Sequence, residues 1–251
     1  MRVHGESGFI LHSRHYSETS LLLEVFSRHY GRLGLIAKGA RRPANRVRGR
    51  LNPFQPLLLG WSGRGELPVL TAAEPEDAGI ELHGPALYCG FYLNELLLRL
   101  LHRHDPHEAL YDVYRASITA LRSDVSNEAA LRVFEKRLLA EVGYGLVLDR
   151  DIADNSPLAA DAVYEYILDR GPARIAEPEL NLRPRGVRMR GTSLIALAND
   201  ALADPAALRE VKQLTRAALA RHLGDKPLHS RKLFSSAVPA HRKDGAREAN
   251  G

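Results

Sequence analysis

The stretch GFILHSRHYSETSLLLEVFSRHYGRLGLIAKG, at residues 8–39, decides the fold of the first part of this chain. Apolar side chains alternate along it, so that Leu23 and Val25 share one face and Phe26 lies on the other. Breakers rich in Gly, Pro and Ser divide this stretch and its continuation into five apolar segments, at 8–14, 20–29, 32–39, 53–62 and 66–74. Five short strands at this spacing predict a small β-barrel or sandwich.

From about residue 80 the spacing of apolar residues changes to three or four, which predicts helices. The helical segments are 86–103, 107–123, 127–144 and 205–224. Asp204 and Pro205 suit the start of the last helix and Gly224 its end. Ser126 and Asn127 form a capping pair before the third helix.

This change of period predicts an α+β protein, with an all-β domain at residues 1–80 followed by an all-α helical domain at 81–240. Several Pro and Gly residues interrupt 149–191, which we expect to be an irregular insertion. The residues at 241–251 are small and polar, and we expect them to form a disordered tail.

Composition narrows the class of protein. The chain has 251 residues, of which 45% are apolar and 26% charged, as in ordinary proteins with a buried core. Its single cysteine, Cys89, excludes an intramolecular disulfide and a zinc site built on two or more thiolates. The first residues lack the apolar core of a signal peptide, and the most apolar stretch, 87–101, is interrupted by three polar residues. We therefore expect a cytoplasmic protein that does not bind membranes.

Positive charge is concentrated in one window. The net charge is +5, but residues 28–50 alone hold eight basic side chains and no acidic one, so the rest of the chain is net negative. Such a run repels itself unless a polyanion or scattered carboxylates offset it. Guanidinium groups match phosphate oxygens, and seven of the eight cations are arginine. The window favours phosphate binding, and the alternative is a solvated loop with surplus arginine.

Motifs for covalent chemistry are absent or incomplete. No phosphate-binding loop is present, GWSGR (60–64) lacks the last glycine of a nucleophile elbow, and HEALY (107–111) lacks the second His of a zinc protease. The segment HRHDPH (102–107) is rich in metal-ligand types, but Pro106 breaks the helix there, which favours a polar turn over a metal site. Cys89 has apolar neighbours, which favour a buried thiol. We expect no catalytic residue, no cofactor and no enzyme activity.

Five stretches together resemble the RecO family of bacterial DNA repair proteins. They are GFILHSRHYSETSLLLEVFSRHYGRLGLIAKGARR (8–42), LNPFQPLLLGWSGRGELPVLTAAE (51–74), FYLNELLLRLL (91–101), LRVFEKRLLAEVGY (131–144) and LGDKPLHSRKLF (223–234). The resemblance implies an N-terminal OB-fold and a helical C-terminal domain. It also implies binding of single- and double-stranded DNA, strand annealing, and recombination mediation together with RecR, the single-stranded DNA-binding protein SSB and, indirectly, RecA.

One feature of many RecO-like proteins is missing here. A zinc module with paired cysteines follows their Gly-Tyr motif, whereas the corresponding residues 146–171 contain no cysteine. We therefore expect no bound metal.

An OB-fold holds single strands through a charged groove and through aromatic rings on which bases stack. The candidate DNA-binding cations are Arg14, Arg28, Arg32, Lys38, Arg41, Arg42, Arg46, Arg48 and Arg50. Strand alternation directs Lys38 outward, opposite Leu35 and Ala37. The aromatic candidates, each of which either packs or stacks on bases, are Tyr16, Tyr30, Phe54 and Trp61.

A second basic feature lies in the helical domain. Arg209, Lys212 and Arg216 follow the i, i+3, i+7 spacing of one helix face, and Arg132 lies on the third helix away from its apolar stripe. The resemblance suggests that these four residues bind the acidic C-terminal tail of SSB, because arginine holds a carboxylate bidentately. The alternative is a solvated polar face.

Three other functions stay open on the sequence. An OB-fold protein that binds RNA fits the same charge pattern, because recognition of the 2′-hydroxyl leaves no motif. A metal-dependent hydrolase would use HRHDPH, and a non-enzymatic scaffold would bind acidic proteins through the basic window. The leading expectation is a nucleoid-associated mediator of DNA repair.

Overall fold

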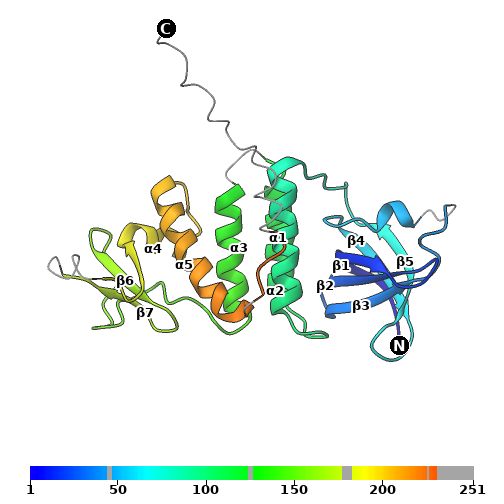
Figure 1. Ribbon diagram of the computed structural model, residues 1–251, viewed down its shortest axis with the longest axis horizontal. Helices are drawn as coiled ribbons and strands as arrows, with labels where there is room; N and C mark the ends of the chain where they lie inside the picture. Colours follow the sequence, from blue (N-terminus) through cyan, green and yellow to red (C-terminus); the bar gives the residue numbers. More distant parts are fainter. Residues whose placement is uncertain (44–46, 124–126, 177–182, 225, 231–251) are drawn as a thin grey trace, which may run out of the picture.

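The computed structural model describes residues 1–43, 47–123, 127–176, 183–224 and 226–230. Three parts follow one another along the long axis of the molecule: a β-barrel, a group of helices and a small second sheet (Figure 1). The prediction of a disordered tail at 241–251 falls outside the described residues, as does Ser126 of the expected capping pair. Within the described part, no helix is both long and apolar enough to cross a membrane.

The predicted N-terminal strands form a closed barrel. Its strands are β1 (Arg2–His15), β2 (Leu21–Ser27), β3 (Gly31–Ala37), β4 (Leu57–Ser62) and β5 (Val69–Pro75). Their order is β1-β2-β3-β5-β4, and all neighbours are antiparallel except β3 and β5. This arrangement is OB-fold-like, as predicted. A short 3₁₀ helix, η1 (Arg48–Arg50), lies between β3 and β4.

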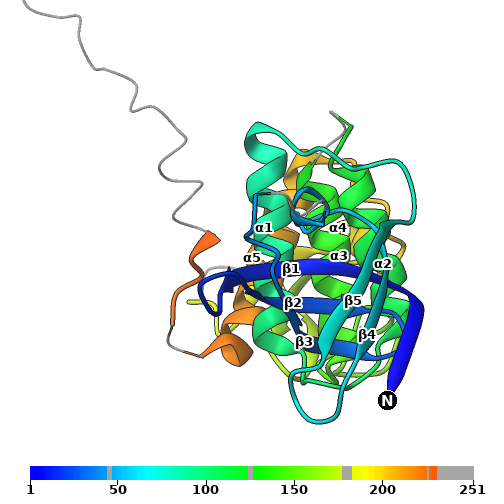
Figure 2. The ribbon, with the colours of Figure 1, turned by 90° about the vertical axis from the view of Figure 1, so that its right-hand side faces the viewer.

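The middle of β1, at residues 8–11, and most of β2 are buried on both faces. Ile10 points into the barrel core with Leu23 and Val25, whereas Phe9 and Phe26 belong to the core of the helices. Both phenylalanines contact the rings of Tyr111 and Tyr114 on the helix α2 (Glu108–Ala120), with centroid separations of 5.0–6.0 Å. The barrel therefore docks on the helices through one outer face, and Figure 2 shows it in front of them.

All four predicted helices are present. They are α1 (Gly84–Leu100), α2 (Glu108–Ala120), α3 (Asn127–Glu141) and α5 (Pro205–Leu223). The carboxylate of Asp204 caps α5 by accepting the N–H groups of Ala206 and Ala207. A further helix, α4 (Gly191–Ala198), was not expected, because its eight residues are too few to show a period.

The expectations of an all-α second domain and of an irregular insertion at 149–191 were wrong. This segment forms an antiparallel sheet of β6 (Val163–Ile167), β7 (Gly171–Arg174) and β8 (Val187–Arg190), in the order β7-β6-β8. Tyr164, Tyr166 and Met189 pack against α4 and α5 in a separate core. These strands have four or five residues and β7 begins with Gly-Pro, so alternation was too short to recognise.

Hydrogen bonds to one buried aspartate hold the loop beside this sheet. Asp151 is almost fully buried, and its carboxylate accepts the N–H groups of Ala153 (2.8 Å) and Arg174 (3.1 Å). Its own N–H donates to the carbonyl of Ser156 (2.8 Å). The cysteine-free loop beside this sheet is thus fixed by a carboxylate.

Candidate nucleic-acid interface

The turn between β1 and β2 meets the segment that follows β3 at one end of the barrel. The Arg41 N–H donates to the carbonyl of Thr19 (3.0 Å). Its guanidinium Nη1 donates to the carbonyls of Ser17 (3.1 Å) and Glu18 (2.8 Å). The β4–β5 turn joins β3 near the same end, where the Ile36 N–H donates to the carbonyl of Pro68 (2.9 Å).

Four of the nine predicted DNA-binding cations gather at this end, which we call the basic rim: Arg14, Lys38, Arg41 and Arg42. In the strand pairing, Arg14 on β1 lies opposite Leu22 on β2, and Leu22 lies opposite Ile36 on β3. Lys38 follows Ile36 by two residues. Arg14, Lys38 and Arg42 are exposed, and Arg41 is half-buried. Among the described residues, no carboxylate lies within ion-pair distance of any of the four. These four cations therefore have no ion-pair partner in the described part of the chain, although Glu18 belongs to the adjacent β1–β2 turn.

Three further predicted cations belong to the segment between β3 and β4. Arg50, which is exposed, donates from Nη1 to the carbonyl of Ala73 on β5 (3.2 Å). Arg46 lies outside the described residues, and only the backbone of Arg48 is described, within η1. Arg64 is exposed in the β4–β5 turn and was not among the predicted DNA-binding cations. Its place in the glycine-rich turn SGRG between two predicted strands is the signal that could have identified it.

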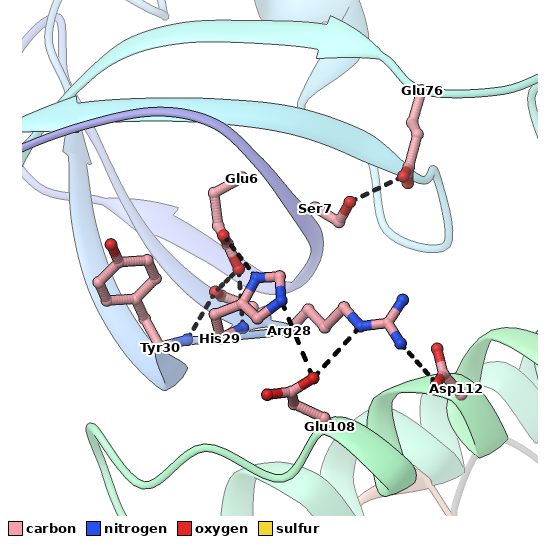
Figure 3. A network of polar contacts seen from close by, with 9 residues as sticks. Glu6, Ser7, Arg28, His29, Tyr30, Glu76, Glu108 and Asp112 are labelled. Carbon is pink, nitrogen blue, oxygen red and sulfur yellow. Dashed lines mark hydrogen bonds and ion pairs between the residues drawn. The ribbon is translucent and has the colours of Figure 1, made fainter.

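Arg28 and Arg32, also predicted to bind DNA, lie apart from the basic rim, between the barrel and the helices. The Arg28 guanidinium is 2.9 Å from the Asp112 carboxylate and 3.8 Å from that of Glu108, both on α2 (Figure 3). The Arg32 guanidinium donates to the carbonyl of Leu98 on α1. Burial lowers the pKa of Arg32, although nearby Glu24 acts in the opposite direction. Both cations are thus used in docking the domains.

A compact polar network supports the same interface. The buried Glu6 carboxylate accepts hydrogen bonds from the Ser27 hydroxyl (2.7 Å) and the His29 N–H (2.8 Å), and lies 3.0 Å from His29 Nδ1 (Figure 3). The other ring nitrogen of His29 is 3.8 Å from Glu108. Every group here has a protein partner, so the network positions the barrel and does not form an open site.

Of the aromatic candidates, only Tyr16 is largely exposed, at 52%. It belongs to the β1–β2 turn, beside the basic rim. Trp61 and Phe54 are buried, and Tyr30 packs edge-on against Trp61 with ring centroids 5.1 Å apart. Phe54 packs against Phe91 on α1. Tyr16 is therefore the one of the four that is free to stack on a base.

The four residues predicted to bind the SSB tail do not lie on one continuous basic surface of the helices. Arg132 is buried, with its guanidinium 2.7 Å from the Glu135 carboxylate and 3.1 Å from the Thr215 hydroxyl. Lys212 forms an ion pair with Glu128 (2.6 Å). Helical spacing could not show that α3 and α5 pack together and enclose Arg132. Arg209 and Arg216 remain exposed on α5.

The HRHDPH segment forms a turn between α1 and α2. His107 lies 3.2 Å from Glu141 and 3.4 Å from Asp105, which makes it a bridge between two carboxylates. Across the described ranges, no three His, Cys, Asp or Glu side chains are arranged to hold a metal ion. Cys89 is buried, and burial raises its thiol pKa to about 11, as in a structural cysteine.

Comparison with known proteins gives consistent matches over nearly the whole chain. The family model described as "Recombination protein O N terminal" matches residues 1–78, and "Recombination protein O C terminal" matches residues 83–232. The DNA repair protein RecO of Nitrosococcus oceani is 50% identical over 234 residues, covering 93% of this chain and 94% of that protein. The DNA repair protein RecO of Alkalilimnicola ehrlichii is 49% identical, and the match covers 93% of this chain and 91% of that protein. The DNA repair protein RecO of Coxiella burnetii is 44% identical, and the match covers 93% of this chain and 98% of that protein.

Proposed function

Because this chain belongs to the RecO family of DNA repair proteins, we propose that it binds single- and double-stranded DNA through the basic rim and anneals complementary strands. We further propose that it works with RecR to help RecA assemble on DNA coated by SSB. One observation carries the proposal: Arg14, Lys38, Arg41 and Arg42 lie together at one end of the barrel, with no described carboxylate close enough to neutralise them.

Charge neutralisation is sufficient for annealing. Two complementary strands repel through their phosphates, and cations that neutralise both lower this barrier while base pairing supplies the free energy. Tyr16 adds a ring on which a base can stack next to the rim. Contact with about four phosphates of a single strand predicts that log affinity falls with log salt at a slope of roughly −3.

The test compares two triple variants in a strand-annealing assay without ATP. Lys38→Glu/Arg41→Glu/Arg42→Glu should abolish annealing and flatten the salt dependence of binding. Arg122→Glu/Arg150→Glu/Arg174→Glu makes the same change in net charge at exposed positions outside the barrel and should leave annealing nearly intact. Equal loss in both variants would mean that net charge alone, and no rim, supports binding.

Binding of the acidic SSB tail is a separate part of the proposal, and the exposed pair Arg209 and Arg216 supports it. Arg209→Glu/Arg216→Glu should weaken binding of a fluorescent SSB-tail peptide while leaving binding of naked DNA nearly unchanged. Loss of DNA binding with retention of the peptide would instead make this helix face a DNA surface.

A further inference from the structure

An exposed aromatic stack lies at the surface of the helical part, outside the barrel. Tyr144, which is 51% exposed, stacks on the imidazole of His222 with ring centroids 3.6 Å apart and planes 17° apart. Tyr144 follows the end of α3, where its N–H donates to the carbonyl of Leu139 (2.7 Å) and Gly143 takes a φ of 86°. His222 belongs to the last turn of α5. Two helix ends therefore hold the pair in place.

This stack separates two hollows in the surface. One of about 530 Å³ and another of about 360 Å³ share Tyr144, Arg221 and His222 among their lining residues. The first also contains His102, and the second Arg170. An exposed ring with a basic side chain in the hollow on either side is the combination that proteins use to hold unpaired nucleotides.

The acidic side chains near the stack already have partners. Asp169 is paired with Arg221 (2.6 Å), and Glu141 and Asp105 both contact His107. By contrast, His102 and Arg170 are exposed and have no carboxylate within ion-pair distance in the described part of the chain. The side chains that these two hollows offer a ligand without a carboxylate partner are therefore basic ones.

We propose that Tyr144, His222 and Arg170 form a second single-strand contact, the stack site, where one nucleobase stacks on the open face of Tyr144. The base extends the Tyr144–His222 stack, and an adjoining phosphate meets Arg170, whereas Arg221 stays paired with Asp169. This inference rests on the proposed single-strand binding, and it extends that binding to the helical part. Because every base has a π face, the site holds single strands of any sequence.

Photocrosslinking tests the stack site directly. An oligo(dT) strand carrying 5-iododeoxyuridine is bound to the full-length protein and irradiated, and the crosslinked peptides are identified by mass spectrometry. The expected result is a crosslink at Tyr144 that disappears in Tyr144→Leu. A crosslink map confined to the barrel, with none at residues 143–147 or 221–222, would overturn the proposal.

Binding measurements add a quantitative test. Tyr144→Ala should weaken oligo(dT) binding about five- to 150-fold, with the salt slope unchanged, because stacking releases no counterions. Tyr144→Phe should retain the affinity, since it keeps the ring. Arg170→Ala should reduce the salt slope by about 0.7. Thermal melting of each variant serves to separate loss of binding from loss of folding.

The outcomes separate this inference from the proposed function. If the triple rim variant abolishes binding while a well-folded Tyr144→Ala binds normally, the stack site is refuted and the rim stands. If the rim variant binds normally while Tyr144→Ala fails, the rim proposal is refuted and the stack site stands.

Discussion

The buried pair of Arg132 and Glu135 should be essential to the stability of the helical part. Both side chains are almost inaccessible, at 3% and 0%, and their charged atoms lie 2.7 Å apart. The Tyr92 hydroxyl donates to Glu135 (2.5 Å), and the Arg132 guanidinium reaches Thr215 on α5. Replacing Glu135 by Leu leaves the guanidinium buried without a counter-charge, which costs about 3–5 kcal/mol. This is a large share of the roughly 5–15 kcal/mol of a typical domain.

The double variant Arg132→Met/Glu135→Leu serves as the matched control. It removes both charges and keeps similar volumes, so its stability should lie within about 1–2 kcal/mol of the wild type or exceed it. Because Arg132 is buried, we expect Arg132→Ala to weaken binding of the SSB-tail peptide only by loosening the contact between α3 and α5. It removes no surface contact with the peptide.

Urea unfolding can follow the two parts of the molecule separately. Far-ultraviolet circular dichroism reports mainly on the helices, whereas fluorescence of the single tryptophan, Trp61, reports on the barrel core. Glu135→Leu should shift the helical transition to lower urea and leave the Trp61 transition nearly in place. Two results would refute the idea that this pair is buried and mutually compensated. One is a loss of less than about 1 kcal/mol in the unfolding free energy of Glu135→Leu, and the other is a double variant as unstable as Glu135→Leu.

Three other predictions follow from single contacts. Asp151→Ala should cost about 2–4 kcal/mol in urea unfolding, because it leaves buried N–H groups unpaired; Asp151→Asn, which keeps one acceptor, should cost less. Gly31→Ala should destabilise more than Gly5→Ala although the two φ angles are 64° and 63°, since only at Gly31 would the new Cβ lie 2.0 Å from the Asp105 carbonyl; equal melting temperatures would contradict this. Folding raises the pKa of the Cys89 thiol from 9.0 to about 11, so the thiol loses its proton at lower pH in the unfolded state than in the folded state. The stability of the protein should therefore fall as pH rises between these two values. The accompanying decline in the urea midpoint should be smaller in Cys89→Ala.

The barrel was predictable because its signals are local. Period-2 alternation and the glycine-rich breakers indicate strands before any contact is known, and they put Val25 and Phe26 on opposite faces. The same reasoning missed β6, β7 and β8, because strands of four or five residues contain too few alternations. Their stability comes from packing Tyr164 and Met189 against α4 and α5, and these contacts leave no pattern within the strands themselves.

The basic window shows why a charge run does not map directly onto a surface. Strand β3 advances about 3.3 Å per residue, so its seven residues carry the chain roughly 23 Å from the region of Arg28 to that of Lys38. Arg28 reaches Asp112 on α2, whereas Lys38 and Arg42 remain without described acidic partners at the other end. One continuous run in the sequence thus supplies two different surfaces.

By itself, the sequence determined the periodicities of the main strands and helices, the inventory of charges and the lack of catalytic motifs, because each is a property of residue types and short spacings. Only the tertiary structure decided which cations stay available for a ligand. Arg28 and Lys212 are neutralised by carboxylates 84 residues away along the chain, and Arg132 is enclosed when α5 packs on α3. Whether a charge is paired depends on which distant segments the fold brings within a few ångströms of it, and no local pattern records that distance.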